Sequence, residues 1–172
     1  MSTDRESLEQ SLASVDIEAM HVSPGEVAGA IEEFVVGDAV GIAGEAFEAR
    51  PETVNWDPTP ADLDDAETGI TPAAFAVADY GSLILPTSPP ACELVSLYVD
   101  RHVAVLEASN VVPDMEAAFD RLDEDVPDAY NDAIIATGPS ATADMGALVK
   151  GAHGPREVRL VVVERDGVEA AD

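Results

Sequence analysis

The sequence predicts a layered α/β domain with a largely parallel sheet flanked by helices. Short apolar runs alternate along the chain with segments of helical periodicity, the pattern of strands that are connected through helices. The apolar runs are continuous, as expected of strands buried on both faces. The chain has 172 residues, of which 47% are hydrophobic, and this is enough for one domain with a core of its own.

Several apolar runs are short enough for strands and lie between turn residues. These runs cover residues 19–22, 39–43, 82–86, 102–107, 133–136 and 158–164. Residues 92–98 fit a short helix or a strand equally well. Residues 50–68 have the proline-rich, acidic composition of a loop. Asp62, Asp64 and Asp65 in this loop are expected to form a solvated face, with metal binding as the alternative.

Helix starts are indicated where a capping residue precedes a proline. Ser23-Pro24 predicts a helix whose buried stripe consists of Val27, Ala30, Ile31 and Phe34. Further helices are expected near residues 45–49, from Thr71-Pro72, from Pro113 to Leu122 with the face Met115, Ala118, Phe119 and Leu122, and from Ser140 to Val149. Residues 1–18 are expected to form a helical or flexible arm, residues 19–166 the single domain and residues 167–172 a tail.

The charge of the chain disfavours nucleic acid and anionic membranes as partners. The sequence has 8 Lys and Arg against 35 Asp and Glu, a formal net charge of −27, which repels phosphate groups. Molar salt shortens the Debye length to about 3 Å and screens the repulsion within the folded chain. We therefore interpret the composition as that of a halophilic, archaeal protein from a salt-rich cytoplasm.

Cysteine content and hydropathy limit which disulfides, metal clusters and membrane helices the sequence could form. Cys92 is the only cysteine of the sequence, so an intramolecular disulfide and a thiolate-bound metal cluster are excluded. We assign no metal ligand. The first residues lack the basic and apolar regions of a signal peptide, and no apolar run reaches the ~18 residues of a membrane helix. A cytoplasmic location is therefore expected.

Residues 134–155 carry the most informative chemical pattern. A strand ends at Gly138, and Ser140 lies where the next helix is expected to begin. Free amide groups and the helix dipole at such a point bind anions, with the hydroxyls of Ser140 and Thr142 as added donors. A carboxylate, a phosphate or a phosphate-bearing cofactor would suit this site. The alternative is that Ser140 only caps the helix and Asp144 stabilises its first turn.

A second glycine-rich loop, residues 151–155, is expected to bring His153 toward the edge of the sheet. Imidazole titrates near neutral pH, so His153 could exchange protons or donate a hydrogen bond to a ligand. A structural role for this histidine is the alternative.

Four sequence motifs together resemble the LUD domain family. They are Gly69-Ile-Thr71, Ala76-Val-Ala-Asp-Tyr-Gly-Ser82, Thr137-Gly-Pro-Ser-Ala-Thr-Ala-Asp144 and Gly151-Ala-His-Gly-Pro155, and the similarity runs from about residue 69 to residue 163. The family usually has Thr in place of Tyr80 and commonly Arg in place of Ala141. Because the arginine would be a bidentate anion donor, its loss changes the ligand or the affinity.

The resemblance implies a fold similar to the ribose-phosphate isomerase and CoA-transferase group. It also implies a role in oxidising L-lactate or a related 2-hydroxy acid, as a subunit that binds no cofactor and whose partners carry iron–sulfur clusters. The site is expected at the carboxyl ends of the strands. Its ligand-binding residues would be Gly81, Ser82, Gly138, Ser140, Thr142 and Gly154, and its proton-exchanging residues Asp144 and His153.

Two other functions stay open at this point. The chain could be a stand-alone enzyme on a phosphorylated sugar or a CoA ester, which rests on fold analogy alone. The sequence lacks both the phosphate-binding loop and the dinucleotide fingerprint that such enzymes often use. Alternatively, the chain could be a structural or regulatory subunit in which the glycine motifs only shape the fold.

Overall fold

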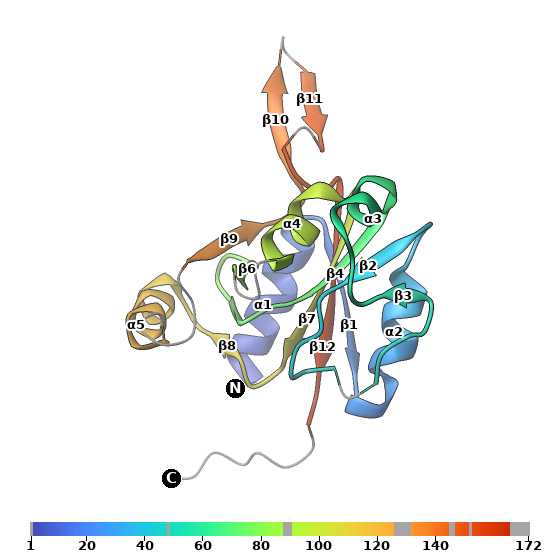
Figure 1. The fold of residues 1–172 in the computed structure, drawn as a ribbon. Coiled ribbons are helices and arrows are strands. Elements are labelled where there is room, and N and C mark those ends of the chain that lie inside the picture. The colour runs from blue at the N-terminus through green and yellow to red at the C-terminus, as the bar shows by residue number, and fades with distance from the viewer. Residues whose placement is uncertain are drawn as a thin grey trace.

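The structure, a computed structural model, describes residues 2–47, 49–87, 91–125, 132–144, 147–151 and 153–165. Its centre is a six-stranded parallel sheet with the strand order β1-β12-β7-β4-β2-β3 (Figure 1). The strands are β1 (Ile17–Val22), β2 (Ala39–Gly41), β3 (Val54–Asn55), β4 (Thr68–Pro72), β7 (Arg101–Glu107) and β12 (Glu157–Val163). The predicted α/β class with a largely parallel sheet is confirmed.

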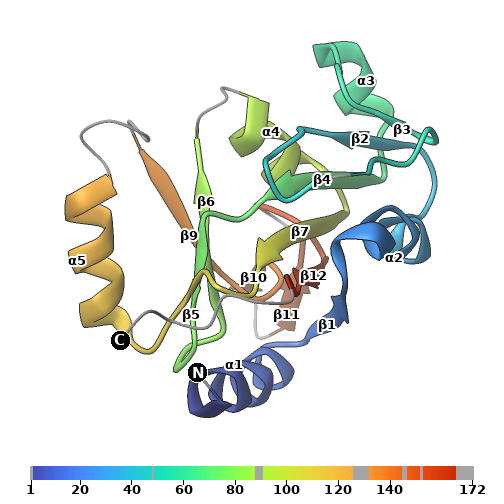
Figure 2. The ribbon, with the colours of Figure 1, turned by 90° about the horizontal axis from the view of Figure 1, so that it is seen from below.

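A second sheet of four strands lies beside the first, in the order β8-β5-β6-β9 (Figure 2). Its strands are β5 (Phe75–Val77), β6 (Ser82–Pro86), β8 (Val111–Val112) and β9 (Ala133–Thr137). Strand β6 pairs antiparallel with both β5 and β9. The sequence pattern predicted the positions of β6 and β9 in the chain. It did not predict that they belong to a second sheet. The buried strand expected at residues 133–136 is an edge strand, in which Ile135 is 43% exposed.

The two faces of the parallel sheet are covered by different layers. The helices are α1 (Ser2–Ser14), the 3-10 turn η1 (Pro24–Glu26), α2 (Val27–Phe34), α3 (Pro60–Asp65), α4 (Ala91–Tyr98) and α5 (Met115–Asp125). In β7, Val103 and Val105 pack in the cluster that contains α2, whereas Ala104 and Leu106 pack with α1 and the second sheet. Side chains alternate along a strand, so burial of both faces requires the continuous apolar run seen in the sequence.

The N-terminal helices follow the sequence pattern closely. Ser23 donates from its amide (3.0 Å) and its hydroxyl (2.6 Å) to Glu26 Oε2, and these two bonds lower the pKa of the Glu26 carboxyl. The predicted stripe of α2 is confirmed, because Val27, Ala30, Ile31 and Phe34 are all buried. Helix α1 buries Leu8 and Leu12 in the core, which ties this N-terminal segment to the domain.

Three of the predicted helices are wrong, and in two of these segments the structure has strands. Thr71 and Pro72 end strand β4, and the amide of Ala73 continues the ladder by donating to Val105 O at 2.8 Å. The described residues of the segment 140–149 do not form a helix either. They contain β10 (Ala141–Asp144) and β11 (Ala147–Lys150), an antiparallel hairpin that projects from the domain (Figure 1). In both segments pairing between strands overrides local helix propensity.

The remaining predictions concern short segments. Residues 45–47 form a turn, not the expected helix, and residue 48 lies outside the described residues. The segment expected to be a loop contains β3 and helix α3, which is capped by Thr59 and Asp62. Residues 91–98 are a helix, and Phe119, placed on the buried face of α5 by the prediction, is 59% exposed.

The sequence predicts a C-terminal tail and no membrane-spanning helix. The tail at residues 167–172 lies outside the described residues. Among the helices that the structure describes, none has the length and apolar character needed to cross a membrane.

Candidate functional site

The two glycine motifs near the C-terminus meet at the base of the β10–β11 hairpin. The amide of Ser140 donates to Pro155 O at 2.8 Å, and the amide of Gly151 donates to Ser140 O at 2.9 Å. Gly154 also lies against Ser140, because a Cβ on this glycine would be 3.1 Å from Ser140 Cβ. The structure brings these residues together, but the amides of Ser140 and Gly151 donate to carbonyl groups of the chain itself.

This junction lies at the amino end of the parallel sheet, not at the predicted carboxyl end. Residues 153–156 lead directly into β12. The amides of Arg156 and Glu157 both donate to the carbonyl of Asp100, the residue that precedes β7. Since no helix begins at Ser140, the expected anion site at a helix N-terminus is also wrong.

Gly81 and Gly138 form the surface on which helix α1 packs. Both adopt left-handed backbone conformations, with φ values of 62° and 69°. A Cβ on Gly81 would lie 2.9 Å from Leu12 N, and one on Gly138 would lie 2.6 Å from Val15 O. These close approaches explain why both positions require glycine. Both residues face the C-terminal end of α1 and the residue that follows it.

Ser82 is buried, and its hydroxyl lies 2.8 Å from Thr137 Oγ1, where β6 pairs with β9. Thr142 is half-buried in the hairpin and pairs with Val149. Both hydroxyl-bearing residues therefore belong to antiparallel strand pairs.

The structure separates the predicted proton-exchanging residues. Asp144 pairs with Ala147 near the far end of the hairpin, three residues beyond Ala141 and so about 10 Å along the strand. His153 is exposed and lies at the base of the hairpin, before β12. The backbone therefore does not bring Asp144 and His153 to one reaction centre.

The cationic side chains at this junction are paired with acids. Lys150 Nζ donates to Asp16 Oδ2 at 3.1 Å, and Arg156 Nε lies 3.3 Å from Asp100 Oδ1.

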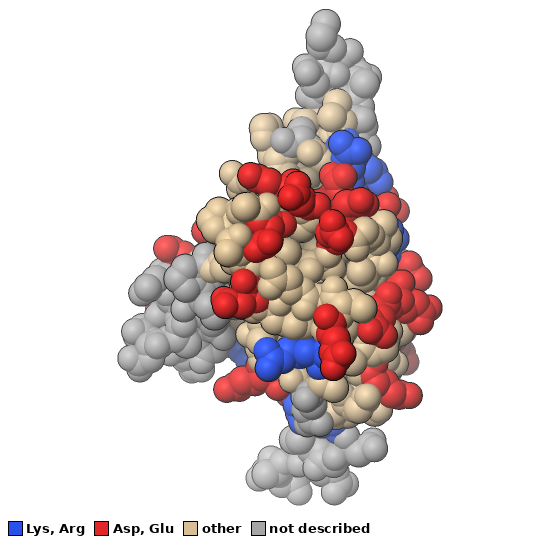
Figure 3. All heavy atoms as spheres, turned by 45° about the vertical axis from the view of Figure 1, so that its right-hand side comes forward, with Lys and Arg blue, Asp and Glu red and all other residues tan. Residues whose placement is uncertain are grey.

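Other basic side chains also form ion pairs with acidic ones. These pairs include Arg5 with Glu9 and Glu164, Arg101 with Glu157, Arg159 with Glu18, and Arg165 with Glu107. On the face shown in Figure 3, acidic side chains are spread over much of the surface and basic side chains cover less of it.

Sequence reasoning missed a buried polar pair beneath these motifs. His102 on β7 is 1% exposed, and its Nε2 lies 2.9 Å from the hydroxyl of Thr71 in the Gly69-Ile-Thr71 motif. Burial lowers the pKa of His102 to about 4, so the imidazole is neutral near pH 7. The sequence feature that could have revealed this pair is His102 itself, a histidine at the start of an otherwise apolar strand.

Comparison with known proteins places these motifs in a family. The family model described as LUD domain matches residues 59–163, more than half of the chain. Lactate utilization protein C of Bacillus licheniformis is 31% identical over 120 residues, which cover 63% of this chain and 49% of that protein. The protein of the same name in Bacillus subtilis is 32% identical over 107 residues, covering 58% and 43%. The chain thus spans about half the length of these relatives.

Two similarities to proteins of Deinococcus radiodurans extend over more of the chain. Its lactate utilization protein C is 28% identical over 153 residues, which cover 83% of this chain and 71% of the relative. The crystal structure of a duf162 family protein at 1.70 Å resolution superposes with a TM-score of 0.71 over 94% of this chain and 97% of that chain, at 20% identity. This second similarity establishes the fold. Because the matching model includes β4, β7, β12 and all four motifs, the chain belongs to the LUD domain family.

Proposed function

We propose that this chain is a LUD-domain subunit of a lactate utilisation system. The proposal rests on one observation: the family model spans all four motifs, and the relatives that match the chain are lactate utilization proteins C. The substrate class in this proposal is L-lactate or a related 2-hydroxy acid.

Oxidation of a 2-hydroxy acid releases electrons, and we assign their acceptors to iron–sulfur clusters on partner subunits. This chain does not fit a cluster, because Cys92 is its only cysteine and a cluster needs several thiolate ligands. Cys92 is also buried, and burial raises the pKa of its thiol to about 11. A thiol that stays protonated is a poor metal ligand.

A small anionic ligand is proposed to bind at the hairpin base through side chains. Ser140 and Thr142 carry hydroxyls there, and His153 is an exposed residue next to Gly154, which lies against Ser140. Hydroxyl and imidazole donors replace the helix terminus that the sequence suggested. Asp144 lies further along the hairpin, so the proposed ligand site does not include it.

The proposal is tested by isolating the tagged chain from the organism that encodes it, in multimolar salt throughout. The eluate is analysed by mass spectrometry, for iron content and for lactate-dependent dye reduction. We expect cysteine-rich iron–sulfur proteins, iron and lactate oxidation in the same fraction. Recovery of the chain without iron and without lactate oxidation would overturn the subunit assignment.

The ligand site is tested within that complex by the double variant Ser140→Ala and His153→Ala. We expect the variant to recover the same partners and to show reduced lactate oxidation. Thr53→Ala removes an exposed hydroxyl far along the chain and serves as the control. Full activity of the double variant would overturn the ligand site and favour a structural subunit.

A further inference from the structure

Strand β9 forms one edge of the four-stranded sheet, and among the strands that the structure describes it pairs only with β6 (Figure 2). Its sequence, Ala133-Ile-Ile-Ala-Thr137, contains neither a charged residue nor a proline. The register with β6 is continuous and has no bulge. Charges, prolines, bulges and very short length are the features that keep edge strands from pairing with other chains. Strand β9 has none of these features.

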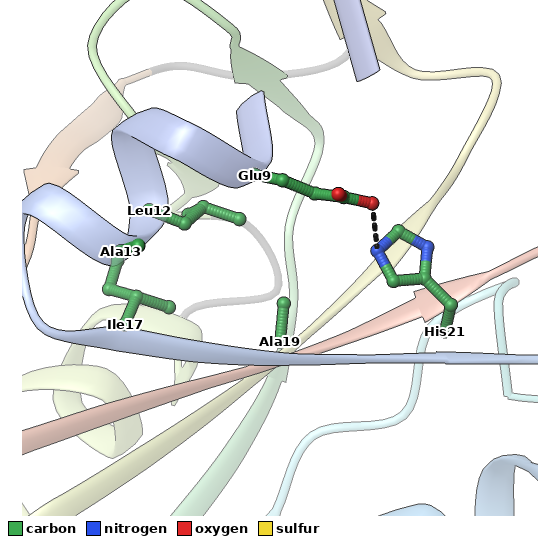
Figure 4. Close-up of a pocket in the computed structure, with 6 residues that line it drawn as sticks. All are labelled: Glu9, Leu12, Ala13, Ile17, Ala19 and His21. Atoms are coloured by element: carbon green, nitrogen blue, oxygen red, sulfur yellow. Dashed lines mark ion pairs between the residues drawn. The ribbon is translucent and has the colours of Figure 1, made fainter. Parts of the chain in front are cut away.

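The other edge strands of the two larger sheets do have such features. Strands β3 and β8 are only two residues long. Strand β1 carries Glu18, which forms an ion pair with Arg159. Helix α1 lies beside β1, and its Glu9 Oε1 is 3.4 Å from His21 Nε2 (Figure 4). An edge that is open to strand pairing is therefore a particular feature of β9.

The pairing with β6 determines which backbone groups of β9 point outward. The amide of Thr87 donates to Asp132 O at 3.2 Å, and these residues are directly opposite when the register is extended by one position. Hydrogen-bonded and non-hydrogen-bonded pairs alternate along antiparallel strands. Ile84 and Ile135, three positions further along, therefore form a non-hydrogen-bonded pair. In agreement with this, Ile84 O accepts from Ala74 N, on the other side of β6.

The amides and carbonyls of Ala133, Ile135 and Thr137 therefore point away from β6. In the part of the chain that the structure describes, these groups form no backbone hydrogen bond. They form a row of donors and acceptors at the spacing of a strand, which another extended segment can pair completely.

The side chain of Ile135 adds an apolar contact at this edge. Its directly opposite neighbour Ile84 is buried in the cluster that includes residues of α5. Directly opposite residues share one face of a sheet, so Ile135 lies on the face that α5 covers. At the edge, however, Ile135 is 43% exposed.

Phe119 of α5 lies toward the same edge. Arg121 of this helix lies over the ring of Phe75 in β5 and donates to Asn110, which precedes β8. Two residues correspond to about 200° around a helix, so Phe119 points away from Arg121 and toward the side of β9. Figure 2 shows α5 beside β9. Phe119 is 59% exposed, so both the helix and the strand present an apolar side chain at this edge.

We propose that β9 pairs antiparallel with β9 of a second copy of the chain, on a two-fold axis at Ile135. The edge is complementary to itself in this register. Ile135 lies opposite Ile135 of the second copy, and Ala133 lies opposite Thr137, so outward-pointing groups meet only outward-pointing groups. Each such pair exchanges two hydrogen bonds. Because β6 and β9 are also antiparallel, the two four-stranded sheets continue as one across the axis.

The charge distribution favours a second copy over a basic partner protein when salt is high. Strand β9 carries no charge, so its pairing buries no carboxylate of either chain. The net charge of −27 makes two copies repel each other at long range, and molar salt screens this repulsion. Pairing between two copies should therefore strengthen with salt, whereas a partner held by opposite charge would dissociate. This interface goes beyond the proposed role in lactate utilisation and does not depend on it.

Sedimentation velocity of the full chain, from micromolar to millimolar protein and from dilute buffer to molar KCl, tests the association. We expect a reversible shift from monomer to dimer as the protein concentration rises, at lower protein concentration in molar KCl. A chain that stays monomeric under all these conditions, or a dimer that dissociates as KCl increases, would overturn the proposal.

Amide hydrogen exchange measured by NMR identifies the surface that forms the dimer. The amides of Ile134 and Ala136 bond to β6 and should be protected at every protein concentration. The amides of Ile135 and Thr137 should exchange rapidly in dilute solution, and about tenfold more slowly where nine-tenths of the chain is dimeric. A dimer in which these two amides still exchange rapidly uses another surface and contradicts the proposal.

Ile135→Lys should abolish the dimer, because two lysine side chains would lie opposite each other on the axis. Val36→Lys is the matched control and should leave the dimer intact. Val36 is 44% exposed, close to the 43% of Ile135, and lies outside both sheets. Ile135→Pro removes the outward amide and leaves the hydrogen bonds to β6 in place, so it should also abolish the dimer. Circular dichroism checks the fold of each variant, and equal dimerisation of Ile135→Lys and Val36→Lys would refute the β9 interface.

Discussion

Thr71 and His102 form a buried hydrogen-bonded pair across two neighbouring parallel strands, with 2.9 Å between Thr71 Oγ1 and His102 Nε2. Both side chains are at most 1% exposed. They lie in the layer between the parallel sheet and helix α4, where Gly69 allows a close approach of the helix to the sheet. A polar pair of this kind stabilises the fold only while the histidine is neutral.

The stability of the protein should therefore fall below about pH 6.5 through His102. Burial lowers the pKa of His102 from 6.5 to about 4. Between these values the unfolded chain binds a proton that the folded chain does not, so the free energy of unfolding decreases as the pH falls. The full effect is on the order of 3 kcal/mol, reached near pH 4. Urea unfolding between pH 7.5 and 4 measures it.

The substitution His102→Gln separates the effect of His102 on the pH dependence of stability from that of the many carboxylates. Glutamine can still form a hydrogen bond with Thr71, but it does not titrate. We expect the variant to have a shallower loss of stability between about pH 6.5 and pH 4. Identical pH profiles for the two proteins would contradict the buried, neutral histidine.

Cys92 should be unreactive in the folded protein. Its side chain is buried, and its pKa is raised to about 11, so at pH 8 only about one molecule in a thousand carries the reactive thiolate. We expect one thiol per chain to react with a disulfide reagent in urea and almost none without it. Rapid labelling of the folded chain would contradict the packing of α4.

Gly138→Ala should destabilise the protein by about 2 kcal/mol or more, because the left-handed conformation alone costs roughly 1–2 kcal/mol in alanine. The new Cβ would also lie 2.6 Å from Val15 O. Gly29→Ala is the matched control: Gly29 lies in helix α2, and a Cβ there meets nothing within 4 Å. We expect this variant to gain about 0.5–1 kcal/mol. Thermal unfolding of both variants decides whether Gly138 holds α1 in place.

Molar KCl should increase the free energy of unfolding. The excess of acidic over basic residues leaves many carboxylates without a cationic partner, and their repulsion is screened at high salt. Circular dichroism at increasing KCl concentration, followed by chemical unfolding at each one, measures the effect. Constant stability from dilute buffer to molar salt would contradict a halophilic adaptation.

Short-range sequence patterns predicted the helices and strands whose local structural preference agrees with the packing of the whole fold. Ser23 with Glu26 caps the start of the turn η1 that leads into α2, and the spacing of Val27, Ile31 and Phe34 matches the buried face of α2. Strand β6 has the predicted limits, Ser82 to Pro86, because a glycine turn precedes it and a proline ends it. In these segments a window of ten residues contains the information that decides the structure.

The candidate site was predicted less well because its structure depends on distant pairing. Residues 140–149 contain good helix formers, but Ser140 bonds to Pro155 and Thr142 pairs with Val149. The two glycine motifs meet in the structure, and the end of the sheet at which they meet depends on the direct connection of the hairpin to β12.

The position of β12 between β1 and β7 has a consequence for synthesis of the protein. β12 is the last described strand to leave the ribosome, and it pairs Val158 with both Ile17 and His102. Until it arrives, β1 has no strand partner, and the parallel sheet remains divided. Closure of the sheet therefore waits until β12 has been synthesised, and the early strands must stay unaggregated until then. Self-repulsion among the many acidic side chains protects the nascent chain during that interval.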